Sequence, residues 1–153
     1  MKKYIIILLL VTSSLWAEQN FKKAIGYSAG VMSGVGMTYR QVNENIGFQV
    51  CSGFSFYEDD IILFSGINII KPIHSVWKTR LNIIGGIGNI QFWEDKEIDT
   101  NTFYTGIGPE VEITFSENIR FIISSPLTVY TPTDYDSMLI AFMPNISLMY
   151  YFR

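Results

Sequence analysis

Residues 138–152 alternate between two kinds of side chain, and this alternation constrains the fold more than any other feature of the chain. Between the apolar positions stand Ala141, Asn145 and Ser147, among larger residues. A period of two is that of a β-strand with one apolar face. Only Arg153 follows in the sequence, so we expect this strand to close a sheet on itself. The apolar face carries Met138, Ile140, Phe142, Pro144, Ile146, Leu148, Tyr150 and Phe152.

The rest of the chain repeats this pattern at intervals of about a dozen residues, with turn signals between the segments. No segment shows sustained helical periodicity. The fold class is therefore predicted to be all-β, either a barrel or a sandwich. Besides 138–152, the predicted strands lie in residues 24–40, 46–57, 61–70, 76–93, 103–115 and 119–130. Segment 61–70 is apolar on both faces, so its inward face cannot be assigned from the sequence.

The first 17 residues have the three regions of a secretory signal peptide. Lys2 and Lys3 precede an apolar run, and small or polar residues lead up to Ala17. We expect cleavage after Ala17, which leaves one domain at 18–153; a retained membrane anchor is the alternative. Without Lys2 and Lys3 the chain has 11 − 2 = 9 basic and 14 acidic residues, a net charge of −5. This charge argues against nucleic acid as a partner. The single cysteine, Cys51, is expected to be a buried filler rather than a reactive thiol.

The distribution of bulk between the two faces favours a barrel in lipid over a sandwich in water. In residues 24–40 one face is apolar, and the other carries glycine, serine, threonine and arginine. A sandwich would pack its bulky face inward and leave the charges outside, whereas a membrane barrel turns its apolar face to lipid and encloses a polar lumen. We therefore predict an antiparallel, up-and-down transmembrane β-barrel.

Seven strands are evident, but bacterial single-chain barrels have an even number. We expect the eighth from a split of residues 21–40 near Ser33 and Gly34, although a count of seven stays open. If the last strand runs toward the periplasm, loops 94–102 and 131–137 lie outside the cell. The turns at 71–75 and 116–118 then face the periplasm.

The end of the chain resembles the C-terminal assembly signal of bacterial outer-membrane barrels. The residues that carry this resemblance are Asn145, Ser147, Tyr150 and Phe152, with Ser147 in place of the usual glycine and Arg153 after the usual terminal aromatic. The mature chain also resembles the small, mostly uncharacterised outer-membrane barrels of Gram-negative bacteria, through residues 30–40 and 106–109. This resemblance implies a location in the outer membrane, contact with its lipids and insertion by the barrel assembly machinery. It implies no activity, and we expect a monomer.

Charged residues on the inward face predict a cluster in the lumen. An eight-stranded barrel is only wide enough inside for side chains, so we expect these charges to pair and fill it. Ion conduction or ligand binding is the alternative. Both glutamates should stay ionised beside so many cations. The predicted cluster consists of Arg40, Lys78, Arg80, Glu110, Glu112 and Arg120.

No catalytic site, cofactor or metal site is predicted. His74 and Ser75 are adjacent in an expected turn, whereas the lipid A deacylases among eight-stranded barrels carry histidine and serine two residues apart. One histidine and one cysteine make no metal site of known spacing. We expect a non-enzymatic outer-membrane barrel of structural, surface-interaction or narrow-pore type. The alternatives are a soluble exported barrel that binds a small apolar ligand, and a lipid A-modifying enzyme.

Overall fold

The computed structural model describes residues 22–30, 34–57, 60–94, 97–131 and 138–152. The predicted signal peptide, residues 1–17, lies outside this part of the chain. Among the described residues there is no helix that is long and apolar enough to cross a membrane. The described strands are β1 (Lys22–Gly30), β2 (Gly36–Val42), β3 (Gly47–Tyr57), β4 (Asp60–Val76), β5 (Thr79–Glu94), β6 (Glu97–Thr114), β7 (Ile119–Ser124), β8 (Leu127–Thr131), β9 (Leu139–Phe142) and β10 (Asn145–Phe152).

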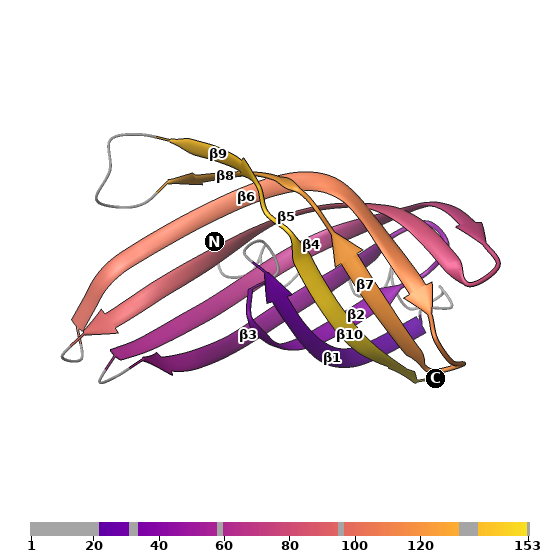
Figure 1. Cartoon of the computed structure of the whole chain (residues 1–153), viewed down its shortest axis with the longest axis horizontal. Coiled ribbons are helices and arrows are strands. Elements are labelled where there is room, and N and C mark those ends of the chain that lie inside the picture. The colour runs from indigo at the N-terminus through magenta and orange to yellow at the C-terminus, as the bar shows by residue number, and fades with distance from the viewer. Residues whose placement is uncertain (1–21, 31–33, 58–59, 95–96, 132–137, 153) are drawn as a thin grey trace, which may run out of the picture.

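The strands form one antiparallel sheet that closes on itself (Figure 1). β1 pairs with both β2 and β10, and the pairing of β5 with β6 completes the ring. The closing strand therefore seals against the N-terminal strand, as expected from the sequence.

Four of the ten described segments are halves of two longer strands. β7 and β8 both pair with β6, at residues 110–114 and 103–107 respectively, and β9 and β10 follow one another in the same way. Pro126 and Pro144 lie in the two interruptions, where a residue without an N–H breaks the ladder. The barrel accordingly has eight strands. β1 ends at Gly30 and β2 begins at Gly36, which confirms that the glycine-rich stretch supplies two strands.

Two predicted connections are wrong. Residues 71–75 belong to β4, and the turn lies at Trp77 and Lys78 instead. Pro72 is tolerated because the pairing of β3 with β4 already ends at Ile70, and a register shift follows between Pro72 and His74. The charged segment 94–102 is mostly strand, since β5 and β6 pair as far as Glu94 with Glu97. Backbone pairing at the end of a hairpin does not require apolar side chains, so composition alone suggested a loop there.

The period of two separates inward from outward residues, most regularly in β2 and β10. In β10 the burial alternates without exception, with Asn145 and Ser147 buried and Tyr150 and Phe152 exposed. In β4, whose faces the sequence left open, Gly66, Asn68 and Ile70 are buried and point inward. The lumen is not uniformly polar, because eight buried residues form an apolar cluster within it: Ala24, Val42, Ile70, Ile84, Tyr104, Ile122, Met149 and Tyr151.

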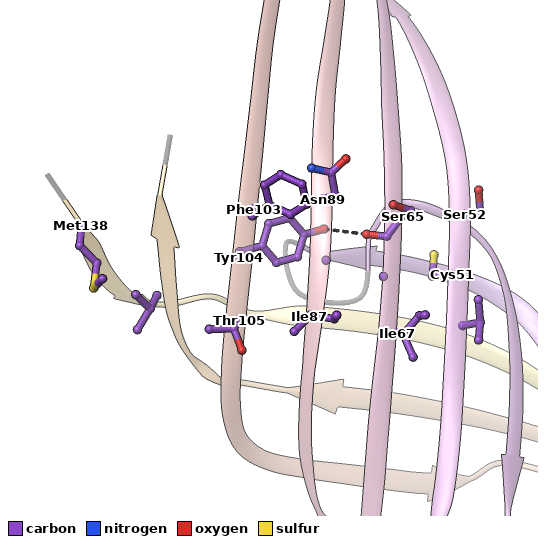
Figure 2. A pocket seen from close by; sticks show the side chains of 14 residues that line it. Cys51, Ser52, Ser65, Ile67, Ile87, Asn89, Phe103, Tyr104, Thr105 and Met138 are labelled. Atoms are coloured by element: carbon purple, nitrogen blue, oxygen red, sulfur yellow. Dashed lines mark hydrogen bonds between the residues drawn. The ribbon is translucent and has the colours of Figure 1, made fainter. Parts of the chain in front are cut away.

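Glycine makes room for an aromatic ring inside the barrel. A Cβ added to Gly88 would lie 2.2 Å from Cε2 of Tyr104, so the ring occupies the space beside this glycine. The Tyr104 hydroxyl donates to the main-chain oxygen of Ser65 at 3.3 Å, which Figure 2 shows. This contact ties β6 to β4 across β5.

The outer face is apolar and carries a hollow of about 520 Å³, whose lining side chains are drawn in Figure 2. Val50, Ile67, Ile87, Thr105 and Val129 are cross-strand neighbours and form one row of its lining. The second row is smaller and more polar, with Ser52, Ser65 and Asn89 before Phe103. Ile67 and Ile87 are more than half exposed, so the described part of the chain leaves most of this apolar surface uncovered.

Candidate functional site: a charge network in the lumen

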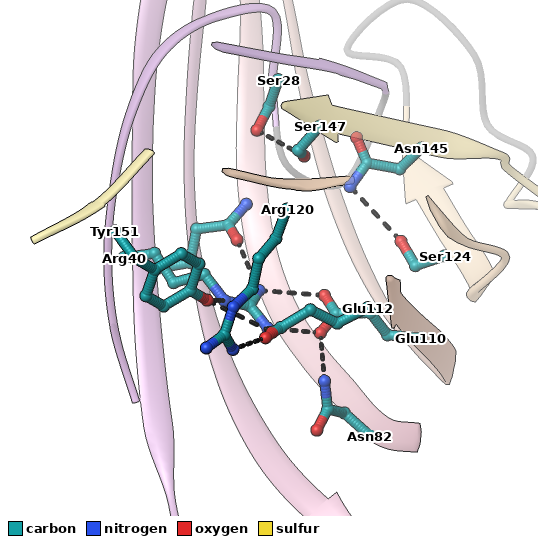
Figure 3. A network of polar contacts seen from close by, with 11 residues as sticks. Ser28, Arg40, Asn82, Glu110, Glu112, Arg120, Ser124, Asn145, Ser147 and Tyr151 are labelled. Carbon is teal, nitrogen blue, oxygen red and sulfur yellow. Dashed lines mark hydrogen bonds and ion pairs between the residues drawn. The ribbon is translucent and has the colours of Figure 1, made fainter. Parts of the chain in front are cut away.

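Charged side chains from three strands meet in the lumen. Arg40 comes from β2, Glu110 and Glu112 come from β6, and Arg120 comes from β7 (Figure 3). All four have inward positions in their strands, and each is at most 8% exposed. Glu110 and Glu112 share one face of β6 because side chains alternate along a strand and these two are two residues apart.

Arg40 is fully saturated with hydrogen bonds. Its Nη2 donates to Glu110 Oε1 at 2.6 Å and to Glu112 Oε2 at 3.0 Å. Its Nη1 donates to Glu110 Oε2 at 3.1 Å and to Gln49 Oε1 at 2.9 Å, and its Nε donates to the Tyr151 hydroxyl at 3.1 Å. A guanidinium has five N–H donors, and five bonds are made here. The side chain therefore acts as a rigid cross-brace between β2, β3, β6 and β10.

Glu112 is the second centre of the network. Its Oε1 accepts from Nη1 of Arg120, and its Oε2 accepts from the Tyr151 hydroxyl at 3.2 Å as well as from Arg40. The Arg120 guanidinium also lies 4.1 Å from the centroid of the Tyr151 ring, a cation–π geometry. The Glu112 carboxylate thus bridges the two arginines, and Glu110 supplies the second negative charge.

Four of the six predicted cluster residues are joined in these ion pairs, and two lie apart from them. Arg80 is the cross-strand partner of Glu112, but its Nη1 has no hydrogen-bond partner among the described residues. Lys78 lies in the β4–β5 turn, with its ammonium 5.0 Å from the ring centroid of Trp77. Side chains alternate between the two faces only within a strand. The prediction that Lys78 points into the lumen is therefore wrong, because Lys78 belongs to the turn.

The sequence did not single out several polar members of the lumen. Asn82 Nδ2 donates to Glu110 Oε1 at 2.7 Å. Further along the lumen, Thr38 donates to the Ser28 hydroxyl at 2.8 Å, and this hydroxyl lies 2.7 Å from that of Ser147. The sequence did place these small polar residues on the inward face. Many residues share that property, so it does not predict which of them form hydrogen bonds with one another.

Four residues resemble an assembly signal, and β10 places two of them inside the barrel and two on its outer face. Asn145 donates from Nδ2 to the Ser124 hydroxyl at 3.3 Å inside the barrel, and Ser147 contacts Ser28. Tyr150 and Phe152 point outward. The Tyr150 hydroxyl accepts a hydrogen bond from Nδ2 of Asn118 at 3.2 Å.

The other chemical possibilities gain no support from geometry. His74 and Ser75 lie side by side on β4, both exposed, and adjacent residues of a strand point to opposite faces. Among the described residues no group of three or more histidine, cysteine, aspartate or glutamate side chains could hold a metal ion. Cys51 is buried and unpaired by any disulfide.

Comparison with solved structures finds proteins of similar fold. The N-terminal β-barrel domain of OprF from Pseudomonas aeruginosa, an outer-membrane protein, superposes with a TM-score of 0.59 over 88% of this chain and 98% of that chain. The two chains share a fold. Their sequences are 11% identical, so the likeness is one of architecture. No protein-family model matches the chain, and a search of curated proteins finds no match.

Proposed function

We propose that this protein is an integral barrel of the Gram-negative outer membrane, with a structural role and no catalysis. One observation carries the proposal: bulky apolar side chains are exposed around a barrel whose interior buries ion pairs. A soluble carrier of apolar ligands has the reverse arrangement, because water meets its outer face. The outward residues that are more than half exposed include Tyr27, Met37, Phe54, Phe56, Ile67, Ile69, Ile87, Phe103, Ile107, Ile140, Phe142 and Leu148.

The connections support an orientation in this membrane. Three described turns, at 43–46, 77–78 and 115–118, lie at the end of the barrel where β1 begins and β10 ends. Barrels of this type have short turns on the periplasmic side, which places that end in the periplasm. Export through the signal peptide at 1–17, contact with outer-membrane lipids and insertion by the barrel assembly machinery belong to the same proposal.

The lumen favours a closed barrel over a narrow pore. Arg40 spans the interior with 0% exposure and holds two glutamates that are each 1% exposed. A passing ion would have to break several charge-assisted hydrogen bonds at once. We therefore propose that the charge network of Arg40, Glu110, Glu112 and Arg120 braces the barrel and blocks passage.

Membrane fractionation combined with gel mobility tests the location. We expect the protein to sediment with outer membranes, to require detergent for extraction and to migrate faster in unheated than in boiled samples. A closed eight-stranded barrel resists unfolding by detergent until it is heated, which causes the difference in mobility. A protein that remains soluble without detergent would reject the membrane proposal.

A further inference from the structure

The described strands leave a gap in the barrel wall beyond the ends of β1 and β2 (Figure 1). β1 ends at Gly30, which pairs with Asn145, and β2 pairs with β3 only as far as Ser52. Both neighbours continue past this level, β9 at 139–142 and β3 at 54–57. Among the described residues, β9 pairs with β8 alone and this part of β3 pairs with β4 alone. Two backbone edges, each about 13 Å long, therefore border the gap.

The gap lies in the half of the barrel that is turned away from the periplasm, at the level of apolar outer surface. Phe54 and Phe56 point outward from β3 beside the gap, and each is more than half exposed. Ile140 and Phe142 do the same on β9. β2 has 7 residues, whereas a strand needs about 9–11 to cross the hydrocarbon layer. In a membrane, lipid chains of the outer leaflet therefore reach the gap.

Apolar side chains face the lumen beside the gap. Ile62 of β4 pairs with Ser55 in the part of β3 that has lost β2, and Phe64 of β4 pairs with Ile90 of β5. By the alternation along these strands, Ile62, Phe64 and Ile90 have inward positions. All three are partly exposed, whereas Ile84, which faces the lumen nearer the periplasm, is fully buried. Apolar surface inside the barrel thus remains uncovered near the gap.

Polar side chains limit the depth of this apolar region. At the level where β1 ends, Asn145 donates to the Ser124 hydroxyl, and nearer the periplasm the hydroxyls of Ser28 and Ser147 lie 2.7 Å apart. The charge network lies below them. A hydrocarbon chain beside these groups would deprive them of hydrogen-bond partners, which is costly. An apolar ligand can therefore occupy only the outer half of the lumen.

We propose, on the basis of the membrane location proposed for this barrel, that the acyl chain of an outer-leaflet lipid enters the outer half of the lumen through the gap between β3 and β9. Backbone edges without a partner strand are costly in hydrocarbon, and the ester or amide oxygens at the head of the chain can accept from their N–H groups. A protein strand is the weaker fit, because only about two residues of each edge point their N–H and C=O groups at the gap.

Photochemical labelling of the unaltered barrel tests this site. The protein is refolded into vesicles of a phosphatidylcholine that carries a diazirine midway along one acyl chain, and tandem mass spectrometry locates the adducts after irradiation. We expect adducts inside the barrel at Ile62, Phe64 and Ile90, in addition to those at outward residues such as Ile87. Ile84 is the internal control, because it faces the lumen from the same strand as Ile90 but lies below the gap, and it should remain unlabelled.

Labelling confined to outward residues would overturn the lumen site and would still agree with a membrane barrel. A protein strand that fills the gap would give the same result, since it would exclude the lipid. Equal labelling of Ile84 and Ile90 would also overturn the lumen site, because the reagent would then be reacting through the wall. Labelling of neither face would contradict the membrane location and the lumen site together.

Two tryptophan variants test the route of entry. Ala141 pairs with the buried Thr128 and has an inward position on β9, at the edge of the gap. Ala141→Trp should therefore obstruct the gap and abolish the adducts at Ile62 and Ile90. The matched control is Ile140→Trp, whose new side chain points outward from the same strand and should leave the lumen adducts unchanged. Both variants must show the heat-dependent gel mobility of the folded barrel, and undiminished lumen labelling in Ala141→Trp would overturn the route.

Discussion

Replacement of Arg40 by methionine is expected to lower the free energy of unfolding by about 3–5 kcal/mol, the usual cost of removing one partner of a buried ion pair. Methionine keeps much of the length of the side chain and removes all five donors. Glu110 then loses both of its bonds to Arg40 and stays buried beside Asn82 alone, among the contacts that the structure describes. Urea unfolding in lipid vesicles, followed by tryptophan fluorescence, measures the loss.

A double variant separates the charge from the packing. In Arg40→Met with Glu110→Met, the buried carboxylate is removed together with its cation, and Glu112 keeps its ion pair with Arg120. Apolar replacement of a whole buried pair is often neutral, so most of the lost stability should return. A loss below about 1 kcal/mol in the single variant would show that the network does not brace the barrel.

Arginine in place of Ile87 is expected to destabilise the barrel in a bilayer by about 2–4 kcal/mol, the cost of arginine on the lipid face near the midplane. Ile87 lies midway along β5, is 62% exposed and borders the outer hollow. Vesicle refolding at a series of urea concentrations gives the free energy for variant and parent. In water the same exposed change would cost about 0.5 kcal/mol or less.

Phe115→Arg is the matched control. Phe115 is 64% exposed, like Ile87, but it lies in the β6–β7 turn at the end of the barrel. Arginine near the interface costs about 0–1 kcal/mol, so this variant should be much less affected. Equal effects at the two positions would mean that depth in a membrane does not matter for this protein.

The architecture could be predicted because strand alternation is a local property. Inward positions of Arg40, Glu110 and Glu112 follow from counting by twos along each strand. The closing strand was predicted over residues 138–152, and its second part, β10, is the part that pairs with β1. The split of the glycine-rich stretch was needed to reach an even number of strands, and the structure has it.

The wrong predictions concern places where the local sequence pattern does not match the pairing of the strands. Pro72 suggested a turn, but β3 pairs no further than Ile70, so the strand continues past the proline without losing a β3 contact. The inward prediction for Lys78 counted it as part of a strand, but Lys78 lies in the β4–β5 turn, where side chains do not alternate. The saturation of Arg40 by Gln49 and Tyr151 could not be predicted, because it depends on which strands face each other across the lumen.

Collision accessibility of a spin label at residue 87 tests whether the outer face of the barrel meets lipid. With Cys51→Ala as the background, a nitroxide is attached to cysteine at 87, and a second sample carries it at Glu117 in the β6–β7 turn. We expect the label at 87 to collide readily with oxygen dissolved in the bilayer and to be protected from a water-soluble nickel complex. The label at 117 should show the opposite. Equal access of the nickel complex to both labels would contradict a barrel whose outer face meets lipid.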